Sequence, residues 1–297
     1  MNNAGDLITS KKNMKTMNQI HLNYVDDLTL AEAIVLPTNL VEVPDRPQPD
    51  PYHARTGHAL PVTNSKVFDQ LKKTQAYAKA NDMKINKKKT KLITFNPCTR
   101  KDFLPQFDLD GNELEVVDEV RLLGLIIRSD MKWQANTDNM VTRANKKLWM
   151  LRRLKYLGAE NVDLVDVYTK QIRSLLELAV PAWQGAITQG ERIEIERVQK
   201  CALRIILGEG YESYKIALGE FNLEDLESRR MKLSLKFAKK AEVHPKHSKW
   251  FKKNINPVNT RQVKHKYWGV QYRHTRFKKS PLSFLTRLLN KDYSRTI

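Results

Sequence analysis

Two adjacent aspartates near the start of the chain have the chemistry to hold divalent metal ions. Asp26 and Asp27 follow Tyr24 and Val25 and precede an apolar run, and this pattern predicts strand, tight turn and strand over residues 22–30. Carboxylates in such a turn can help to hold two Mg2+ ions, which clamp the attacking and leaving oxygens of a phosphoryl transfer. Adjacent aspartates are also common in solvated turns, so the pair by itself leaves both interpretations open.

The positive charge of the chain is concentrated at its C-terminal end. The 297 residues carry a formal net charge of +19. Residues 1–228 contain 32 Lys and Arg against 31 Asp and Glu, whereas residues 229–297 contain 20 against 2. Nucleic acid is the expected partner, because the release of counterions from phosphates rewards such charge density. A membrane surface is disfavoured, since no window there has the broad apolar face of an interfacial helix.

Aromatic residues are interleaved with these cations, namely Trp250, Phe251, Tyr267, Trp268, Tyr272 and Phe277. Trp250 and Trp268 could stack on bases while Lys278 and Lys279 hold phosphates. The same aromatic side chains could instead anchor the tail onto the preceding helices. The sequence leaves these two interpretations open.

Other classes of site are disfavoured. Cys98 and Cys201 are far apart, which argues against a disulfide scaffold or a zinc site and favours an intracellular protein. His244 and His247 are three residues apart, but Pro245 lies between them and no third ligand is near, so we expect a solvated basic tail there. The sequence contains no signal-peptide pattern and no apolar run of about 18 residues, so no membrane span is expected.

The order of elements predicts an α+β fold followed by an all-helical part and a basic tail. We expect a polar tail at 1–20, an α+β unit at 21–134 with a Pro-rich insertion at 37–61, helices at 135–243, and a basic aromatic tail at 244–297. Apolar residues at helical spacing predict helices at about 136–157, 161–180 and 191–207, and another from about 222. Residues 120–127 are expected to form a buried strand interrupted at Gly124.

Several segments in a fixed order carry a resemblance to a known family. They are Tyr24–Asp27, Met83–Lys91, Arg121–Ile127, Lys132–Trp133, Ile172–Leu176 and Glu196–Ala202. Together they resemble the C-terminal part of the reverse transcriptases of non-LTR retrotransposons, close to the jockey-like group, over roughly residues 23–243. The resemblance implies a partial polymerase palm at 21–134, a thumb-like helical domain that packs against a duplex at 135–243, and a basic tail.

The resemblance also implies roles for single residues. Asp26 would be a ligand of the catalytic Mg2+ or Mn2+ ions with Asp27 in support, and Tyr24 would lie near the primer end. Lys89 would lie beside the incoming triphosphate, and Gly124 would belong to a hairpin that grips the primer. The alternatives are that Lys89 belongs to a solvated lysine-rich turn and that Gly124 marks a bulge in a buried strand.

A polymerase palm needs a further aspartate on a neighbouring strand upstream of this hairpin. Before Tyr24 the only acidic residue is Asp6, and its surroundings do not resemble that motif. We therefore expect a truncated RNA-directed DNA polymerase that is inactive alone, unless a partner supplies the remaining palm and fingers. The alternatives are a non-catalytic basic nucleic-acid-binding module and a gene fragment whose palm-like part folds poorly. The family and the lysine clusters indicate a nuclear location.

Overall fold

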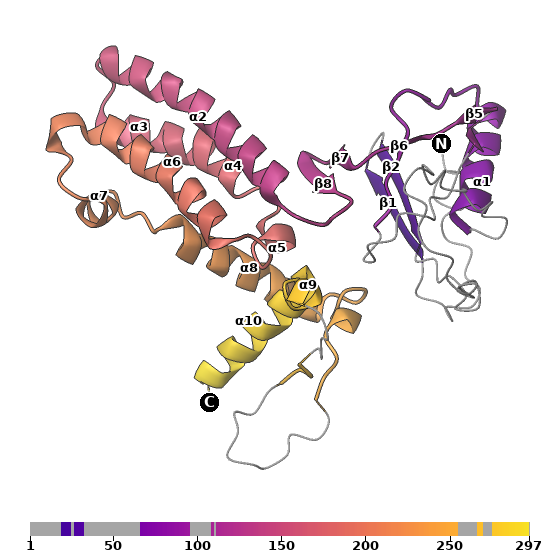
Figure 1. Ribbon diagram of the computed structural model, residues 1–297. Coiled ribbons are helices and arrows are strands. Elements are labelled where there is room, and N and C mark those ends of the chain that lie inside the picture. Colours follow the sequence, from indigo (N-terminus) through magenta and orange to yellow (C-terminus); the bar gives the residue numbers. More distant parts are fainter. Residues whose placement is uncertain are drawn as a thin grey trace, which may run out of the picture. The chain divides into compact units, whose positions relative to one another are not determined.

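The computed structural model describes residues 19–24, 27–32, 66–95, 108–109, 111–254, 266–269 and 275–296. They form a mixed α+β structure that is mostly helical (Figure 1), which confirms the predicted fold class at this coarse level. The chain divides into two compact units, Met1–Val117 and Asp118–Ile297. The predicted Pro-rich insertion at 37–61 and almost all of the predicted tail at 1–20 lie outside the described residues.

The first unit contains the predicted hairpin of the aspartate pair. Strand β1 (Gln19–Tyr24) pairs antiparallel with β2 (Asp27–Glu32), and Tyr24 lies opposite Asp27. This register leaves two residues to connect the strands, which is the commonest length of a hairpin loop. The two predicted strands and their pairing are therefore confirmed, and the predicted turn at 25–26 lies outside the described residues.

The rest of the first unit combines one helix with very short paired strands around a small core. Its elements are α1 (Lys66–Ala80), β3 (Lys91–Leu92), β4 (Asp108–Leu109), β5 (Asn112–Glu113) and β6 (Glu115–Val116). Strands β3 and β6 pair parallel, and β4 and β5 pair antiparallel. Leu109 and Leu114 are buried against the apolar face of α1, which presents Val67, Phe68 and Leu71. Among the described residues of this unit, these few side chains form a small hydrophobic cluster.

The second unit begins with a hairpin that the sequence prediction described wrongly. Residues 120–127 do not form one interrupted strand, because β7 (Glu119–Leu122) turns back into the antiparallel β8 (Leu125–Arg128). Leu123 and Gly124 form the turn with φ of 48° and 87°. Positive φ at both central residues is the requirement of a type I′ turn, whose twist matches that of the strands. Gly124 therefore marks a turn and not a bulge.

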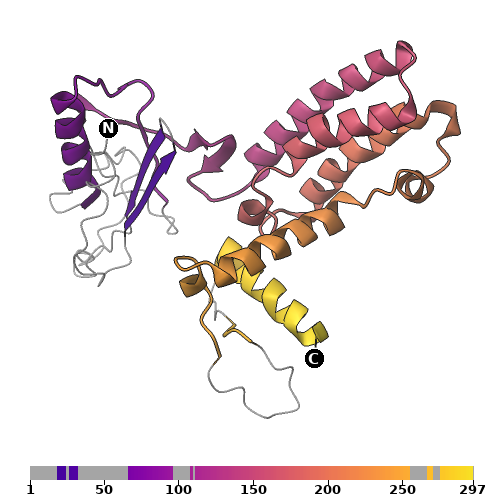
Figure 2. The ribbon, with the colours of Figure 1, turned by 180° about the vertical axis from the view of Figure 1, so that it is seen from behind.

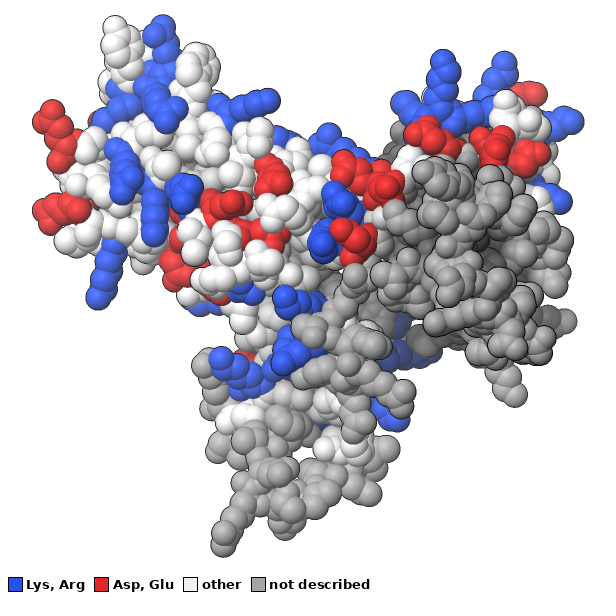
Figure 3. All heavy atoms as spheres, viewed as in Figure 1, with Lys and Arg blue, Asp and Glu red and all other residues white. Residues whose placement is uncertain are grey.

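The helical part follows the predicted order (Figure 2). Its helices are α2 (Gln134–Tyr156), α3 (Asn161–Val167), α4 (Ser174–Leu176), α5 (Val180–Trp183), α6 (Gln189–Leu207), α7 (Tyr214–Glu220), α8 (Leu226–Val243), α9 (Thr275–Lys278) and α10 (Pro281–Thr296). Helices α2 and α6 pack side by side and bury the apolar stripes that predicted them, with Met140, Leu148 and Ile195 in the main core. Lys and Arg side chains line the outer side of α2 (Figure 3).

The predicted helix at 161–180 is interrupted twice. A π-helical turn (Tyr168–Arg173) separates α3 from α4, and Ala179 has a left-handed backbone with φ 48° and ψ 34°. The chain therefore breaks at Ala179, and Pro181 lies in the first turn of the next helix, α5, where its fixed φ and missing N–H are tolerated. The widened turn places Tyr168 fully inside the core.

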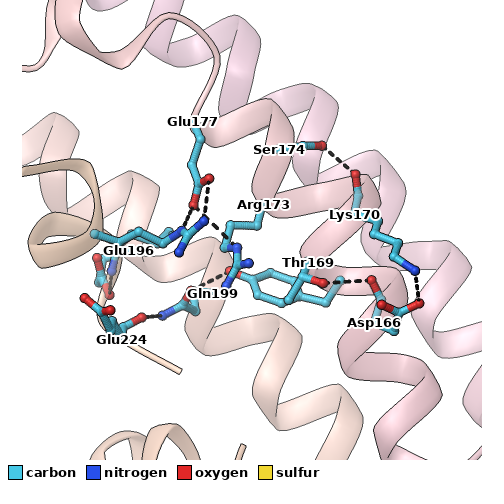
Figure 4. Close-up of polar contacts among 12 residues, drawn as sticks. Asp166, Thr169, Lys170, Arg173, Ser174, Glu177, Glu196, Gln199 and Glu224 are labelled. Carbon is cyan, nitrogen blue, oxygen red and sulfur yellow. Dashed lines mark hydrogen bonds and ion pairs between the residues drawn. The ribbon is translucent and has the colours of Figure 1, made fainter. Parts of the chain in front are cut away.

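A chain of buried and partly buried hydrogen bonds joins four segments of the helical part (Figure 4). The Tyr168 hydroxyl donates to Gln199 Oε1 at 2.6 Å. Gln199 Nε2 donates to the Tyr214 hydroxyl and to the Glu224 carbonyl, each at 2.8 Å. Tyr214 in turn donates to Glu196, whose carboxylate also accepts from the first N–H of α8 at 3.1 Å. This network ties the π-helical turn, α6, α7 and the start of α8 together.

A close backbone approach positions the last helix. A Cβ added to Gly185, just after α5, would lie 2.6 Å from both Cβ and Cγ of Phe284 in α10, so only glycine fits there without movement. Beside it, the buried Arg230 of α8 donates from Nε to Gln184 Oε1 at 2.8 Å. The short α5 thus supports both α8 and α10.

We predict that Tyr168→Phe lowers the free energy of unfolding by about 1–3 kcal/mol, because Gln199 Oε1 would remain buried without its donor. Tyr156→Phe is the matched control, since Tyr156 is 80% exposed and should change stability by less than about 0.5 kcal/mol. Urea denaturation monitored by circular dichroism measures both changes. Equal midpoints for the two variants would show that the buried network contributes no stability.

Candidate nucleic-acid interface

Two aromatic residues fix the basic segment that follows α8. Phe251 and Tyr267 are 4% and 1% exposed, and their ring centroids lie 5.7 Å apart. They share a core with Ala238 of α8 and Leu289 of α10. These two rings therefore do what the anchoring interpretation of the tail aromatics expected.

Backbone pairing holds the two parts of this segment in register. Lys253 forms an antiparallel bridge with Tyr267, and the Trp268 N–H donates to the Lys252 carbonyl at 2.9 Å. Asn290 of α10 clamps Tyr267, accepting from its N–H at 2.9 Å and donating to its carbonyl at 3.0 Å. The pairing fixes which residues face the core and which face solvent.

The neighbours of the two anchors are exposed. Trp250 precedes Phe251 and is 41% exposed, and Trp268 follows Tyr267 and is 52% exposed. Successive side chains of an extended, paired backbone point to opposite faces, which accounts for the exposure of Trp268 beside the buried Tyr267. The two predicted tryptophans thus remain available for stacking, while other aromatics bear the anchoring.

A column of three stacked rings extends the exposed surface. His244 and His247 lie 4.1 Å apart and His247 and Trp250 4.4 Å apart between centroids, with interplanar angles of 20° and 21°. Trp250 ends a 3₁₀ turn (Ser248–Trp250), and side chains three residues apart are in line in such a turn. The N–H groups of Lys246 and His247 donate to His244 Nδ1 at 3.2 and 3.4 Å, which orients the first ring.

Exposed lysines surround the column. Lys246, Lys249, Lys252 and Lys253 are all exposed, and residues 244–254 contain no acidic residue. The other predicted cations, Lys278 and Lys279, are also exposed and follow the half-exposed Phe277 at the end of α9. Arg287 of α10 donates to the Lys278 carbonyl at 3.1 Å and so ties that segment to the helix. We call the exposed rings and lysines of 244–254, 266–269 and 277–279 the basic aromatic surface.

One partly buried acid holds this surface together. Glu242 at the end of α8 accepts from Lys266 Nζ at 2.6 Å and from the Tyr267 hydroxyl. Burial by itself would raise the pKa of Glu242, but the hydrogen bonds from Lys266 and Tyr267 hold that pKa below the ordinary value of a glutamate. The ionised carboxylate is therefore favoured in the folded state.

The other predicted site residues, Tyr24, Asp26, Asp27, Lys89 and Gly124, do not belong to the basic aromatic surface. Tyr24 and Asp27 occupy paired positions at the end of the β1–β2 hairpin, whereas Asp26 lies outside the described residues. Lys89 is exposed in a turn, where its N–H donates to the Asn86 carbonyl at 3.1 Å and to Asn86 Oδ1 at 3.2 Å. Gly124 belongs to the turn of the second unit's hairpin.

No metal-ligand set is assembled in the part of the chain that the structure describes. There, no group of three or more His, Cys, Asp or Glu side chains is placed to hold an ion. Two divalent ions need several carboxylates around them, so we derive no catalytic step through Mg2+ or Mn2+. Among the same described residues no helix is long and apolar enough to cross a lipid bilayer.

The chain matches no protein-family model, no curated protein and no solved structure.

The sequence prediction assigned His244 and His247 to a solvated basic tail and missed that they stack. The spacing of three from His244 to His247, and again from His247 to Trp250, is the signal that could have identified the stacked column. The same spacing would suit a pair of metal ligands on a helix, but the two rings stack on each other instead.

We predict that Glu242→Gln destabilises the protein at about pH 7 and that its effect shrinks as the pH falls. Because the folded-state pKa is lowered, the stabilisation by Glu242 is complete above the unfolded pKa of about 4.5 and is lost as the pH falls through the lower folded value. Denaturation midpoints of wild type and variant between about pH 3 and pH 7 test this. Glu220→Gln, at an exposed position at the end of α7, is the control, and an equal pH response of both variants would contradict the prediction.

Proposed function

We propose that this chain binds single-stranded nucleic acid through the basic aromatic surface. The observation that carries the proposal is that Trp250 and Trp268 are 41% and 52% exposed while their neighbours Phe251 and Tyr267 are buried. Exposed aromatic rings on an anchored backbone offer their faces for stacking, and bases are a planar partner whatever their sequence. The ordered backbone also lowers the entropy that stacking would have to overcome.

The charge around the rings supports the same function. The four exposed lysines of residues 244–254, a stretch without Asp or Glu, can neutralise phosphates and release their counterions. The stacked column of His244, His247 and Trp250 presents a ring face at the same place. Arrays of cations and aromatic rings are the usual means of binding single strands without reading their sequence.

We further propose that the chain derives from the C-terminal part of a non-LTR retrotransposon reverse transcriptase. The support is the order of motifs in the sequence and the β1–β2 hairpin, in which Tyr24 pairs with Asp27. In this proposal the chain retains nucleic-acid binding, whereas DNA synthesis needs metal ligands from outside the described residues or from another chain.

We expect Trp250→Ala and Trp268→Ala each to weaken binding of a labelled single-stranded oligonucleotide by about tenfold, because a stacked base contributes about 1–3 kcal/mol. Trp250→Phe should keep most of the affinity. Phe95→Ala, which removes an exposed aromatic ring from the first unit, is the control and should leave affinity unchanged. Fluorescence anisotropy at fixed salt measures all four, and full affinity of both tryptophan-to-alanine variants would refute stacking at this surface.

We expect the purified chain alone not to extend a primer on an RNA template, in Mg2+ or in Mn2+, because two ions need a fuller set of carboxylates than the described residues assemble. Wild type and Asp26→Ala should give the same background in a primer-extension assay. Extension by the wild type that disappears in Asp26→Ala would show that a complete site is assembled and would overturn this part of the proposal.

A further inference from the structure

The outer face of α2 carries large aromatic side chains in open solvent. Trp149 is 67% exposed and Tyr156 is 80% exposed. They are seven residues apart, so they lie on one stripe of the helix, two turns and about 10 Å apart along its axis. The main core uses the opposite face of α2, through Met140, Leu148 and Leu151, so packing within the helical part does not explain the two rings.

Cations flank the two rings on the same stripe of the helix. Lys146, Arg152 and Arg153 are exposed on the same stripe, three to four residues from Trp149 or Tyr156. The Arg153 guanidinium lies 5.5 Å from the centroid of the Tyr156 ring, which steadies that ring on the surface. Helix α2 contains six Lys and Arg but a single acid, Asp138, in its second turn.

The mixture of charge and rings selects the partner. A protein partner that covered two aromatic rings would also have to accommodate three cations interleaved with them. A nucleic acid presents both negative charges and planar faces along one strand, so it satisfies both features together. In a duplex the bases are already stacked on each other, and exposed rings on a helix gain nothing from them. Unpaired bases can stack on Trp149 and Tyr156.

We infer that the outer face of α2 is a second binding surface for single-stranded nucleic acid, separate from the basic aromatic surface. Trp149 and Tyr156 stack on unpaired bases, and Lys146, Arg152 and Arg153 hold the flanking phosphates. Two turns of helix between the rings leave room for bases of different nucleotides. The surface contributes to affinity for any sequence, and its contribution falls as salt rises. The inference rests on the proposed function, since it assigns further residues to the same ligand.

The test uses the full chain and a fluorescein-labelled oligo(dT) of about 20 nucleotides, longer than the site of a typical single-strand-binding fold. Trp149→Ala should weaken binding by about tenfold, and Trp149→Phe should restore most of the affinity. Ile193→Ala removes an exposed apolar side chain from α6 and is the matched control. Replacing Lys146, Arg152 and Arg153 with Gln should lower the slope of log affinity against log salt by about 0.7 for each phosphate that is no longer neutralised.

A photo-crosslink locates the binding surface independently of affinity. An oligonucleotide with 5-iodouracil in place of thymine should crosslink to Trp149 or Tyr156, identified by mass spectrometry of the α2 peptide. No crosslink to α2 together with full affinity of Trp149→Ala would overturn the inference. So would a duplex of the same length whose affinity falls equally in Trp149→Ala, or a self-associated wild type that Trp149→Ala converts to monomer.

The two surfaces can be tested separately. Loss of binding in Trp250→Ala but not in Trp149→Ala would leave the proposed function standing and remove this inference. Loss of binding in Trp149→Ala but not in Trp250→Ala or Trp268→Ala would remove the proposed binding through the basic aromatic surface and leave the outer face of α2 as the binding surface. Reductions in binding free energy that add in the Trp149→Ala, Trp250→Ala double variant would show that both surfaces bind the strand and do so independently.

Discussion

The side chain of Gln199 is the constraint on which the helical part of the molecule depends. Its amide accepts from Tyr168 in the π-helical turn and donates to Tyr214 and to the Glu224 carbonyl, so one residue of α6 joins three other segments. In a low-dielectric interior each of these bonds is strong only if all partners are present. The arrangement therefore requires the widened turn at Tyr168, the short α7 and the start of α8 at the same time.

The position of α8 then determines the position of everything after it. Helix α8 provides Ala238 and Ala241 to the second core, against which Phe251, Tyr267 and α10 pack. Small side chains on α8 allow α10 to approach closely, and Asn290 of α10 clamps the backbone of Tyr267. The exposed tryptophans of the basic aromatic surface thus depend, through two layers of packing, on buried groups of the helical part.

Much of the helical part could be predicted from the sequence, because apolar stripes are a property of single segments. Met140 and Leu148 identified α2 well, and Ile195 identified α6. The breaks could not be predicted in the same way. The π-helical turn at Tyr168 depends on a hydrogen bond to a residue 31 positions away, and the left-handed Ala179 has no local signal comparable to glycine. The turn at Leu123-Gly124 was not predicted, because the apolar run around it suggested one buried strand.

The candidate site was predictable in composition but not in arrangement, since Trp250 and Trp268 stand out as aromatic residues among lysines. Which aromatics anchor and which remain exposed depends on the bridge between Lys253 and Tyr267, two residues separated by segments with no periodic pattern. Helix α10 was missed for a related reason, since its apolar positions lie in a stretch whose charge dominated the prediction.

The close approach of Gly185 to Phe284 has a consequence for how this chain tolerates change. Any side chain at 185 would push α10 away from α5, and with it Asn290, which holds the backbone of the segment that bears Trp268. A random mutagenesis screen for loss of binding would therefore recover residue 185, although it is neither charged nor aromatic. In a set of diverging descendants, the identity of residue 185 would report whether the C-terminal helix is still docked.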